Sequence, residues 1–285
     1  MLAFRGLGQS MIMFSFLLLV AQQPSSCASL PGRQQADERL SELFDYDRPA
    51  QSEAELTALA DLALSCGSPE LAAASLAQAA RAQGIQNKFS QAQETLARAA
   101  QLATVPSTSI KIVLEQGRIA RRERKSDQAR AYLTRAFDRA KADRLDALAA
   151  DAAHMLALLE TDDSYLQWTA RGLAIAEGSQ DPVARRWVGN LAYNAGIRLS
   201  ESGDHQAAAL MFARSLAARR IENDPELVAG AELALSAELA HLGRLDEAEA
   251  IQRRLLIGAE SNPDFAAEVQ AQLDRLAKLK QEAGK

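Results

Sequence analysis

The sequence is poor in the residues that build β-sheets. Among its 285 residues, valine and isoleucine together number only 17, and aromatic side chains make up 5%. A pleated sheet needs branched and aromatic side chains to fill its faces. Alanine, in contrast, accounts for 58 residues, about one in five. We therefore exclude a sheet-based fold and expect an all-α protein.

Cysteine, histidine and positive charge are also scarce, and this excludes several classes of function. Two cysteines and three histidines cannot build a zinc finger, a CxxC pair or a framework of several disulfides. A nucleic-acid-binding chain would be basic, whereas this one has a net charge of −5. Phosphate loops, metal motifs and nucleophile elbows are absent from the sequence. We expect a non-enzyme without catalytic residues, metal or cofactor, and no nucleic-acid partner.

Only one apolar run is long enough to matter for targeting. It spans the 11 residues Met11 to Ala21 behind Arg5, which is shorter than a membrane-spanning helix and typical of an export signal. Three outcomes stay open: cleavage after Ala28 and release, lipid attachment at Cys27, or an uncleaved signal as anchor. Pro24 argues against lipid attachment at Cys27, because a lipoprotein signal normally has a branched apolar residue at the position of Pro24. We expect an exported protein of a bacterial periplasm or cell envelope. Its only contact with the membrane would be a lipid on Cys27 or an uncleaved signal. We expect Cys66 to be a buried small apolar residue at the end of a predicted helix. If Cys27 is cleaved off or acylated, Cys66 has no intramolecular partner.

Prolines divide the rest of the chain at regular intervals. Pro69, Pro106, Pro182, Pro225 and Pro263 are separated by 37, 76, 43 and 38 residues, and 76 is twice 38. Proline suits the first position of a helix, and a polar residue beside it caps the helix. The predicted caps are Ser68, Ser107, Asp181, Asp224 and Asn262. A fixed period near 40 residues predicts a solenoid of helical repeats.

Each interval holds two predicted helices, because the apolar residues recur three and four apart and glycine interrupts them. In the final interval, Gly243 ends the first helix and Asp246 caps the second. The expected pairs are 69–83 with 90–103, 107–122 with 127–141, 144–160 with 164–177, 182–202 with 205–219, and 225–242 with a helix from 246. The expected domains are a signal peptide (1–28), a linker with a first leading helix (29–51), the repeat domain (52–262) and a polar capping helix (263–285).

These pairs resemble the tetratricopeptide repeat (TPR) family. The second helix of that repeat opens with glycine, a gap, a large residue, an acidic pair and alanine, which Gly203–Ala208 and Gly243–Ala248 match. Lys125–Ala129 and Phe89–Ala92 match more weakly. Small residues stand where helices cross, at Gly117, Ala153, Gly196 and Ser236 and again at Ala99, Ala136, Gly172 and Ser215. The resemblance implies a right-handed superhelix of about five antiparallel pairs; the alternative is an irregular all-α domain rich in alanine.

The resemblance also implies that the first helices line a concave surface that binds peptides or proteins. Mapped onto this sequence, the binding residues are Lys111, Arg118, Arg121, Arg122, His154, Asn190, Tyr193 and Asn194. Arg118, Arg121 and Tyr193 are expected in one groove that takes a partner that is acidic or has a free carboxylate. The alternative interpretation of the run from Arg118 to Arg124 is a solvated helix end, whose cations complement the helix dipole. Asn194 matches the asparagine of a family carboxylate clamp. That clamp also needs lysine and arginine in the flanking first helices, where this sequence has Ala150, His154, Leu233 and Ala237, so we do not carry the clamp over.

The sequence therefore predicts an exported scaffold that binds a protein or peptide through its concave face. Its role would be the assembly or localisation of a cell-envelope complex. A peptide-binding sensor or regulator, an all-α enzyme and a purely structural oligomer remain as alternatives. Catalysis would have to use His154 with Asp151, a spacing that is usually structural.

Overall fold

The computed structural model describes residues 25–32, 35–161, 164–259 and 262–283. Every regular element among these residues is a helix, and each helix from α2 to α13 packs mainly on its neighbours in the chain, whereas α1 packs on α3. The elements are η1 (Ser25–Ser29), α1 (Ala36–Glu42), α2 (Pro49–Ser65), α3 (Pro69–Ile85), α4 (Phe89–Leu102), α5 (Pro106–Arg122), α6 (Ser126–Ala142), α7 (Asp146–Leu159), α8 (Ser164–Gly178), α9 (Pro182–Glu201), α10 (His205–Glu222), α11 (Pro225–His241), α12 (Leu245–Gly258) and α13 (Pro263–Ala283). The expected all-α solenoid is confirmed.

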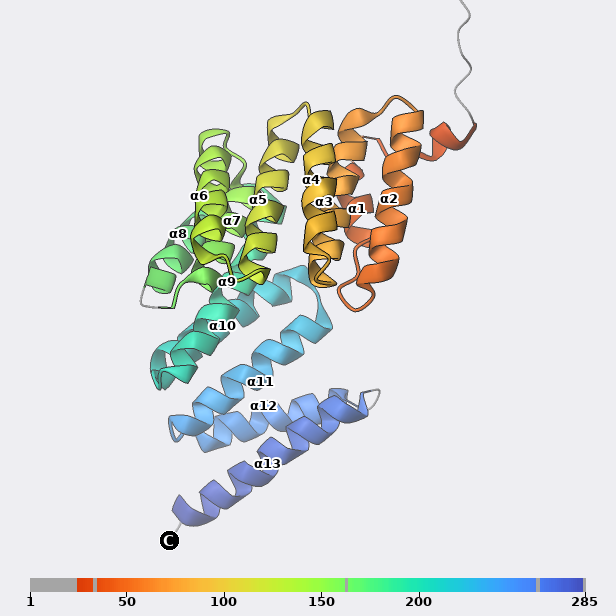
Figure 1. Ribbon diagram of the computed structural model, residues 1–285. Coiled ribbons are helices and arrows are strands. Elements are labelled where there is room, and N and C mark those ends of the chain that lie inside the picture. The colour runs from red at the N-terminus through yellow and green to blue at the C-terminus, as the bar shows by residue number, and fades with distance from the viewer. Residues whose placement is uncertain (1–24, 33–34, 162–163, 260–261, 284–285) are drawn as a thin grey trace, which may run out of the picture.

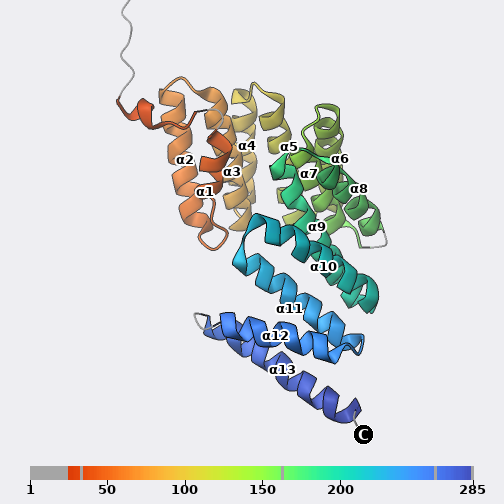
Figure 2. The ribbon, with the colours of Figure 1, turned by 180° about the vertical axis from the view of Figure 1, so that it is seen from behind.

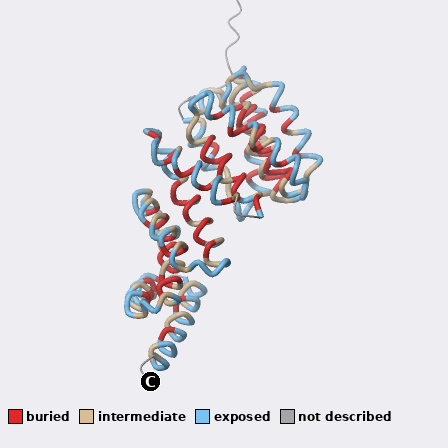
Figure 3. Tube along the Cα trace, turned by 90° about the vertical axis from the view of Figure 1, so that its left-hand side faces the viewer, coloured by how far each residue is buried: buried red, intermediate tan, exposed pale blue. Residues whose placement is uncertain are grey.

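The helices form one continuous stack that changes direction along its length. Helices α2 to α8 stand side by side, and α10 to α13 follow below them with their axes turned across the first group (Figures 1 and 2). Helices α3, α5, α7 and α9 contact one another in succession, while α11 packs on α10 and α12. Buried residues follow the facing sides of successive helices, and α13 is largely exposed toward the C-terminus (Figure 3). We call the surface formed by α3, α5, α7 and α9 the inner face.

Many of the turns between helices share one geometry. Gly67, Gly203 and Gly243 have φ of +70°, +83° and +74°, which glycine adopts without steric cost. At Gly243, its own N–H bonds to the Ala240 carbonyl and the next N–H to the Leu239 carbonyl, so the last turn of α11 is closed. Asn87, Arg124 and Arg144 make the same two bonds with φ near +60°. These tight turns force consecutive helices to run antiparallel.

The small residues at the helix crossings are required by close approach. A Cβ added to Gly117 would lie 2.6 Å from Leu133 of α6, and one at Gly196 would lie 2.7 Å from Phe212 of α10. A Cβ at Gly172 of α8 would meet Leu191 of α9 at 2.9 Å. The glycines at these three positions therefore allow close packing between the two helices of one pair and between helices of successive pairs.

Three of the predicted caps are correct and three are wrong. The carboxylates of Asp181 and Asp224 accept backbone N–H bonds at the starts of α9 and α11, and Asn262 accepts one from Phe265. Ser68 is the residue before α3 but its side chain makes no capping bond, and Ser107 lies inside α5, because the helix already begins at Pro106. Asp246 also lies inside its helix and pairs with Lys280 of α13 instead.

Candidate functional site

The inner face contains a pocket of about 430 Å³ lined by side chains from α3, α5, α7 and α9 and by Tyr46 of the α1–α2 loop. We call it the arginine pocket. Its polar lining residues are Tyr46, Arg81, Glu115, Arg118, Arg121, Arg122, His154, Asn190 and Asn194. Six of the eight residues expected to bind a partner therefore lie together. They are Arg118, Arg121, Arg122, His154, Asn190 and Asn194.

Arg118 forms the buried base of this pocket and is not an exposed cation. Its guanidinium contacts Asp151 of α7 at 2.5 Å and Glu115 one turn earlier at 3.3 Å, and the residue is 8% exposed. The interpretation of the whole basic run as a solvated helix end is therefore wrong for Arg118, whereas Arg122 and Arg124 are exposed. The ion pair ties α5 to α7 because each charge compensates the other away from water.

Glu115 lies beside Arg118 and is a buried acid, 5% exposed, in the lining of the arginine pocket. Burial raises the pKa of its carboxyl above the usual range, and the opposing charges of Arg118 and Arg81 only partly offset that effect. One of its oxygens, Oε2, has no hydrogen-bond partner.

His154 faces the pocket from α7, between Asn194 and Trp187. Its Nε2 lies 2.6 Å from Asn194 Nδ2, and its ring centroid lies 5.3 Å from that of Trp187. Burial, followed by the charges of Arg118 and Arg121, lowers the pKa of His154 to about 4, although Asp151 opposes this. The ring is therefore neutral at pH 7. Because Asp151 pairs with Arg118, the structure does not form the histidine–carboxylate pair that catalysis by His154 would use.

A second pocket of about 500 Å³ adjoins the first and is covered by α1. Tyr46, Arg81 and Trp187 line both pockets. Lys111 lies in this second pocket, where its ammonium group contacts Asp37 of α1 at 2.5 Å. The structure therefore separates Lys111 from the arginine pocket and pairs it with the chain's own N-terminal segment.

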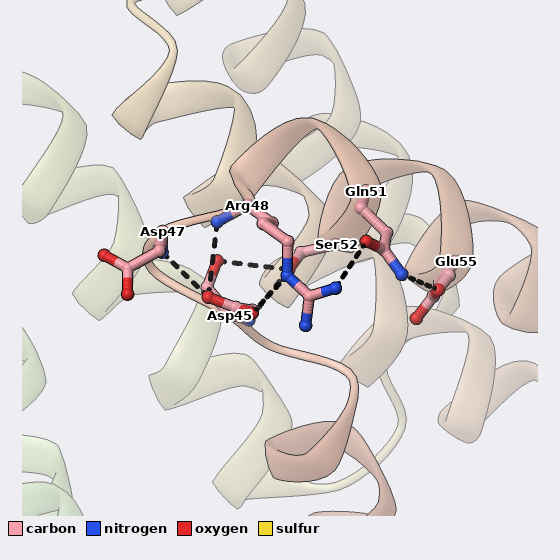
Figure 4. Close-up of polar contacts among 6 residues, drawn as sticks. All are labelled: Asp45, Asp47, Arg48, Gln51, Ser52 and Glu55. Carbon is pink, nitrogen blue, oxygen red and sulfur yellow. Dashed lines mark hydrogen bonds and ion pairs between the residues drawn. The ribbon is translucent and has the colours of Figure 1, made fainter. Parts of the chain in front are cut away.

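The loop between α1 and α2 is held by a compact polar turn (Figure 4). Oδ1 of Asp45 accepts the backbone N–H groups of Asp47 and Arg48 at 2.8 and 3.2 Å, and its other oxygen accepts Arg48 Nε at 2.7 Å. The hydroxyl of Ser52 accepts the backbone N–H of Asp45 at 2.8 Å. The hydrogen bond from the Arg48 side chain is the main reason why the pKa of Asp45 lies below its usual range. The carboxylate of Asp45 therefore stays ionised.

This turn places two aromatic rings against Arg81 of α3. The Arg81 guanidinium lies 5.0 Å from the ring centroid of Phe44 and 5.2 Å from that of Tyr46, and it donates a hydrogen bond to the Tyr46 hydroxyl. Arg81, Tyr46 and Trp187 line the pocket although the sequence did not predict them as binding residues. The position of Arg81 on the inner side of the first repeat could have identified it, but no local signal places Tyr46 there.

Tyr193 does not belong to the arginine pocket, so its expected place beside Arg118 and Arg121 is wrong. Its ring packs edge-on against Phe212 at 5.4 Å, and the guanidinium of Arg219 lies 4.3 Å from its centroid. Both contacts come from α10, which shows that Tyr193 fills the joint of its own helix pair.

Cys27 and Cys66 form a disulfide between η1 and the end of α2. Cys66 is buried as expected, but it is bonded and does not lack a partner. A sulfur in this bond cannot carry a lipid, and cleavage after Ala28 would remove half of the pair. Residues 1–24 of the expected signal lie outside the described residues.

The described residues hold no group of three or more potential ligands arranged for a metal ion. None of the helices among them combines the length and apolar character needed to cross a bilayer.

No family model matches this sequence, and no curated protein matches it either. Among solved structures, the fold is similar to the crystal structure of BtubC (BKLC) from P. vanneervenii, with a TM-score of 0.57. The match covers 81% of this chain and 93% of that chain, at 17% sequence identity. At this identity the likeness concerns the fold alone, and it supports the conclusion that the chain is a helical repeat-type protein.

Proposed function

We propose that this protein is an exported scaffold of the TPR type that binds a segment of a partner protein on its inner face. Its role would be the assembly or localisation of a cell-envelope complex. The observation that carries the proposal is the convergence of four inner helices on one polar pocket. Arginine in such a position is a frequent anchor of protein interfaces.

The disulfide supports the export part of this proposal. Disulfides persist in oxidising compartments and are rare in the reducing cytoplasm. The pair Cys27–Cys66 therefore agrees with passage of the chain out of the cytoplasm, as the apolar run 11–21 predicts. The small residues at the helix crossings support the TPR type, because they occupy the positions that the resemblance requires.

A peptide-binding sensor or regulator is the second candidate, and one observation favours it. The arginine pocket is preformed and bounded by Tyr46, so it suits a short ligand better than a broad protein surface. Such a protein would retain less than one equivalent of ligand after purification, which native mass spectrometry detects.

In-cell photo-crosslinking tests the scaffold proposal. A photoreactive residue in place of Asn190 lies exposed at the arginine pocket, while one in place of Arg139 lies exposed on α6, outside that pocket. We expect a partner protein crosslinked from position 190 and not from position 139, identified by mass spectrometry of the tagged protein. The same products from both positions, or none from position 190, would contradict the proposal. Crosslinks to a second copy of the chain would indicate a structural oligomer instead.

A further inference from the structure

Helix α1 is the exception to the stacking of neighbouring helices. It packs mainly on α3, and Figure 2 shows it outside the row that α2 to α8 form. The loop that follows α1 brings Phe44 and Tyr46 onto Arg81, which also belongs to α3. We call residues 36–46 the strap. The strap forms one wall of the second pocket, opposite side chains of α5, α7 and α9.

Few contacts hold the strap against the inner face. Leu40 is the only buried residue of the seven-residue helix α1, and it packs in a cluster with Leu56 of α2 and Ala79 of α3. The residue before α1 makes no side-chain capping bond. In the ion pair with Lys111, the Asp37 side chain is 76% exposed. A helix this short is not stable in water by itself, so the closed position of the strap depends on these contacts.

Both ends of the strap are tied to α2. On one side the disulfide joins Cys27 to Cys66 at the end of α2, and on the other side the chain enters α2 at Pro49. Helix α2 has 17 residues, so its two ends lie about 25 Å apart. The chain between Cys27 and Pro49 could span about 70 Å when extended. The strap therefore has enough slack to leave the pocket while the disulfide stays intact.

The strap covers part of the surface that the proposed function assigns to a partner. Lys111, one of the residues expected to bind that partner, is occupied by Asp37 of the strap. Tyr46, Arg81 and Trp187 line both the second pocket and the arginine pocket. A partner segment that extends from the arginine pocket into the second pocket must therefore displace the strap.

We propose that the strap is an autoinhibitory gate of the second pocket. It closes over the inner face through Leu40 and Asp37, and it opens as a tethered loop without loss of the disulfide. Because the tether keeps the strap close to its binding surface, reclosing is an intramolecular event that competes with any partner segment. The gate itself goes beyond the proposed function, and only the identity of the competing segment rests on it.

Hydrogen exchange followed by mass spectrometry tests the opening on the oxidised full-length protein. The hydrogen-bonded amides of residues 39–44 should be protected, but they should exchange at least about tenfold faster than those of α3, because they open locally. Leu40→Ala removes the buried anchor and should speed this exchange about tenfold or more. Leu210→Ala makes the same change at a 63% exposed leucine of α10 and should leave the strap unchanged.

A charge swap isolates the contribution of the ion pair to closing. Asp37→Lys places a cation against Lys111 and should speed exchange of the strap about two- to fivefold, a small effect because Asp37 is exposed. Asp37→Lys/Lys111→Asp restores opposite charges and should recover a slower rate. Since both variants carry the same change in the first turn of α1, the recovery measures the pair alone.

Photo-crosslinking shows what occupies the second pocket. A photoreactive residue in place of Ala147 of α7 lines this pocket. In the purified oxidised protein we expect a crosslink within the chain to residues 36–46, and Leu40→Ala should reduce that product severalfold. In cells, the same substitution should raise the yield of partner crosslinked from position 147.

Three results would overturn the gate. Strap amides that are as protected as those of α3, or equal exchange in Leu40→Ala and Leu210→Ala, would show that the strap is a fixed part of the fold. Strap amides without any protection in the wild type would show that it does not close. An intrachain crosslink from position 147 that is absent, or unchanged in Leu40→Ala, would show that the strap does not cover the pocket.

The gate and the scaffold fail separately. Hydrogen exchange and the intrachain crosslink need no partner, so a strap that opens as expected stands even when positions 147 and 190 yield no partner, a result that contradicts the scaffold. A partner that crosslinks equally from position 147 in the wild type and in Leu40→Ala overturns the gate and leaves the scaffold standing.

Discussion

The guanidinium of Arg118 on α5 lies 2.5 Å from the carboxylate of Asp151 on α7, and neither side chain is more than 12% exposed. This ion pair joins consecutive repeats under the arginine pocket. Its burial means that the basic run of α5 has a structural part, Arg118, and a part available to ligands, Arg121 and Arg122. Separate substitutions can therefore distinguish stability from binding.

Removal of Asp151 should be far more costly than removal of an exposed acid. Asp151→Ala leaves Arg118 buried without its main counter-charge and should lower the free energy of unfolding by about 3–5 kcal/mol. Asp61→Ala breaks the pair with Arg98, whose side chains are 61% and 48% exposed, and should cost about 1 kcal/mol or less. Urea denaturation of both variants checks this, and equal losses would contradict a buried ion pair at Arg118.

His154 should make the protein less stable in acid. Its pKa falls from 6.5 to about 4 on folding, mainly because burial disfavours the charged ring. Between these two pH values the unfolded chain binds a proton that the folded chain does not, so stability is lost as the pH falls through this window. The loss is up to about 3 kcal/mol.

The matching variant isolates this contribution. His154→Gln keeps a polar side chain but cannot titrate, so its loss of stability between pH 7 and pH 5 should be smaller than that of the wild type. Glu115 acts in the opposite direction, because its pKa is raised on folding, and it is present in both proteins. Urea denaturation at the two pH values measures the difference, and parallel losses in both proteins would show that His154 is not buried as described.

The glycine at a helix crossing should tolerate a methyl group much less well than a glycine in open space. Gly117→Ala brings the new Cβ to 2.6 Å from Leu133, and overpacking of this kind costs about 1–3 kcal/mol. Gly230 lies in α11 with nothing within 4 Å of an added Cβ. Gly230→Ala should therefore stabilise the helix by about 0.5–1 kcal/mol. Thermal unfolding of the two variants should shift in opposite directions, and a shift of the same sign would refute the close crossing.

Much of the fold was predictable because its signals are local. Proline marks the starts of α3, α5, α9, α11 and α13, and glycine marks the turns after α9 and α11. The caps at Ser107 and Asp246 were misplaced because a helix can begin one or two residues before the polar side chain that seems to cap it.

The site was only partly predictable because it depends on rotation and on distant contacts. Tyr193 and Asn194 are adjacent, but one residue turns a helix by about 100°, so only Asn194 faces the arginine pocket. The ion pair that ties Arg118 to the next repeat depends on Asp151, 33 residues away on another helix. Tyr46 reaches Arg81 across 35 residues through a loop without any periodic pattern. Spacing along the chain cannot reveal such contacts.

The disulfide predicts where the mature chain begins and how its cysteines react. Exported protein should retain Cys27, so N-terminal sequencing should find a start at or before that residue, and no thiol should react with maleimide before reduction. Cys27→Ser should lower the stability of the N-terminal helices by about 2–4 kcal/mol, because the bond joins residues 39 apart and restrains the unfolded chain. The double variant Cys27→Ser/Cys66→Ser serves as the control and should lose no more than the single one, since both remove the same bond. A mature chain that starts after Ala28 and has a reactive Cys66 would show that the disulfide does not form in the cell and that the protein is cleaved and released. A lipid found on Cys27 would likewise exclude the disulfide and would show that the protein is lipid-anchored.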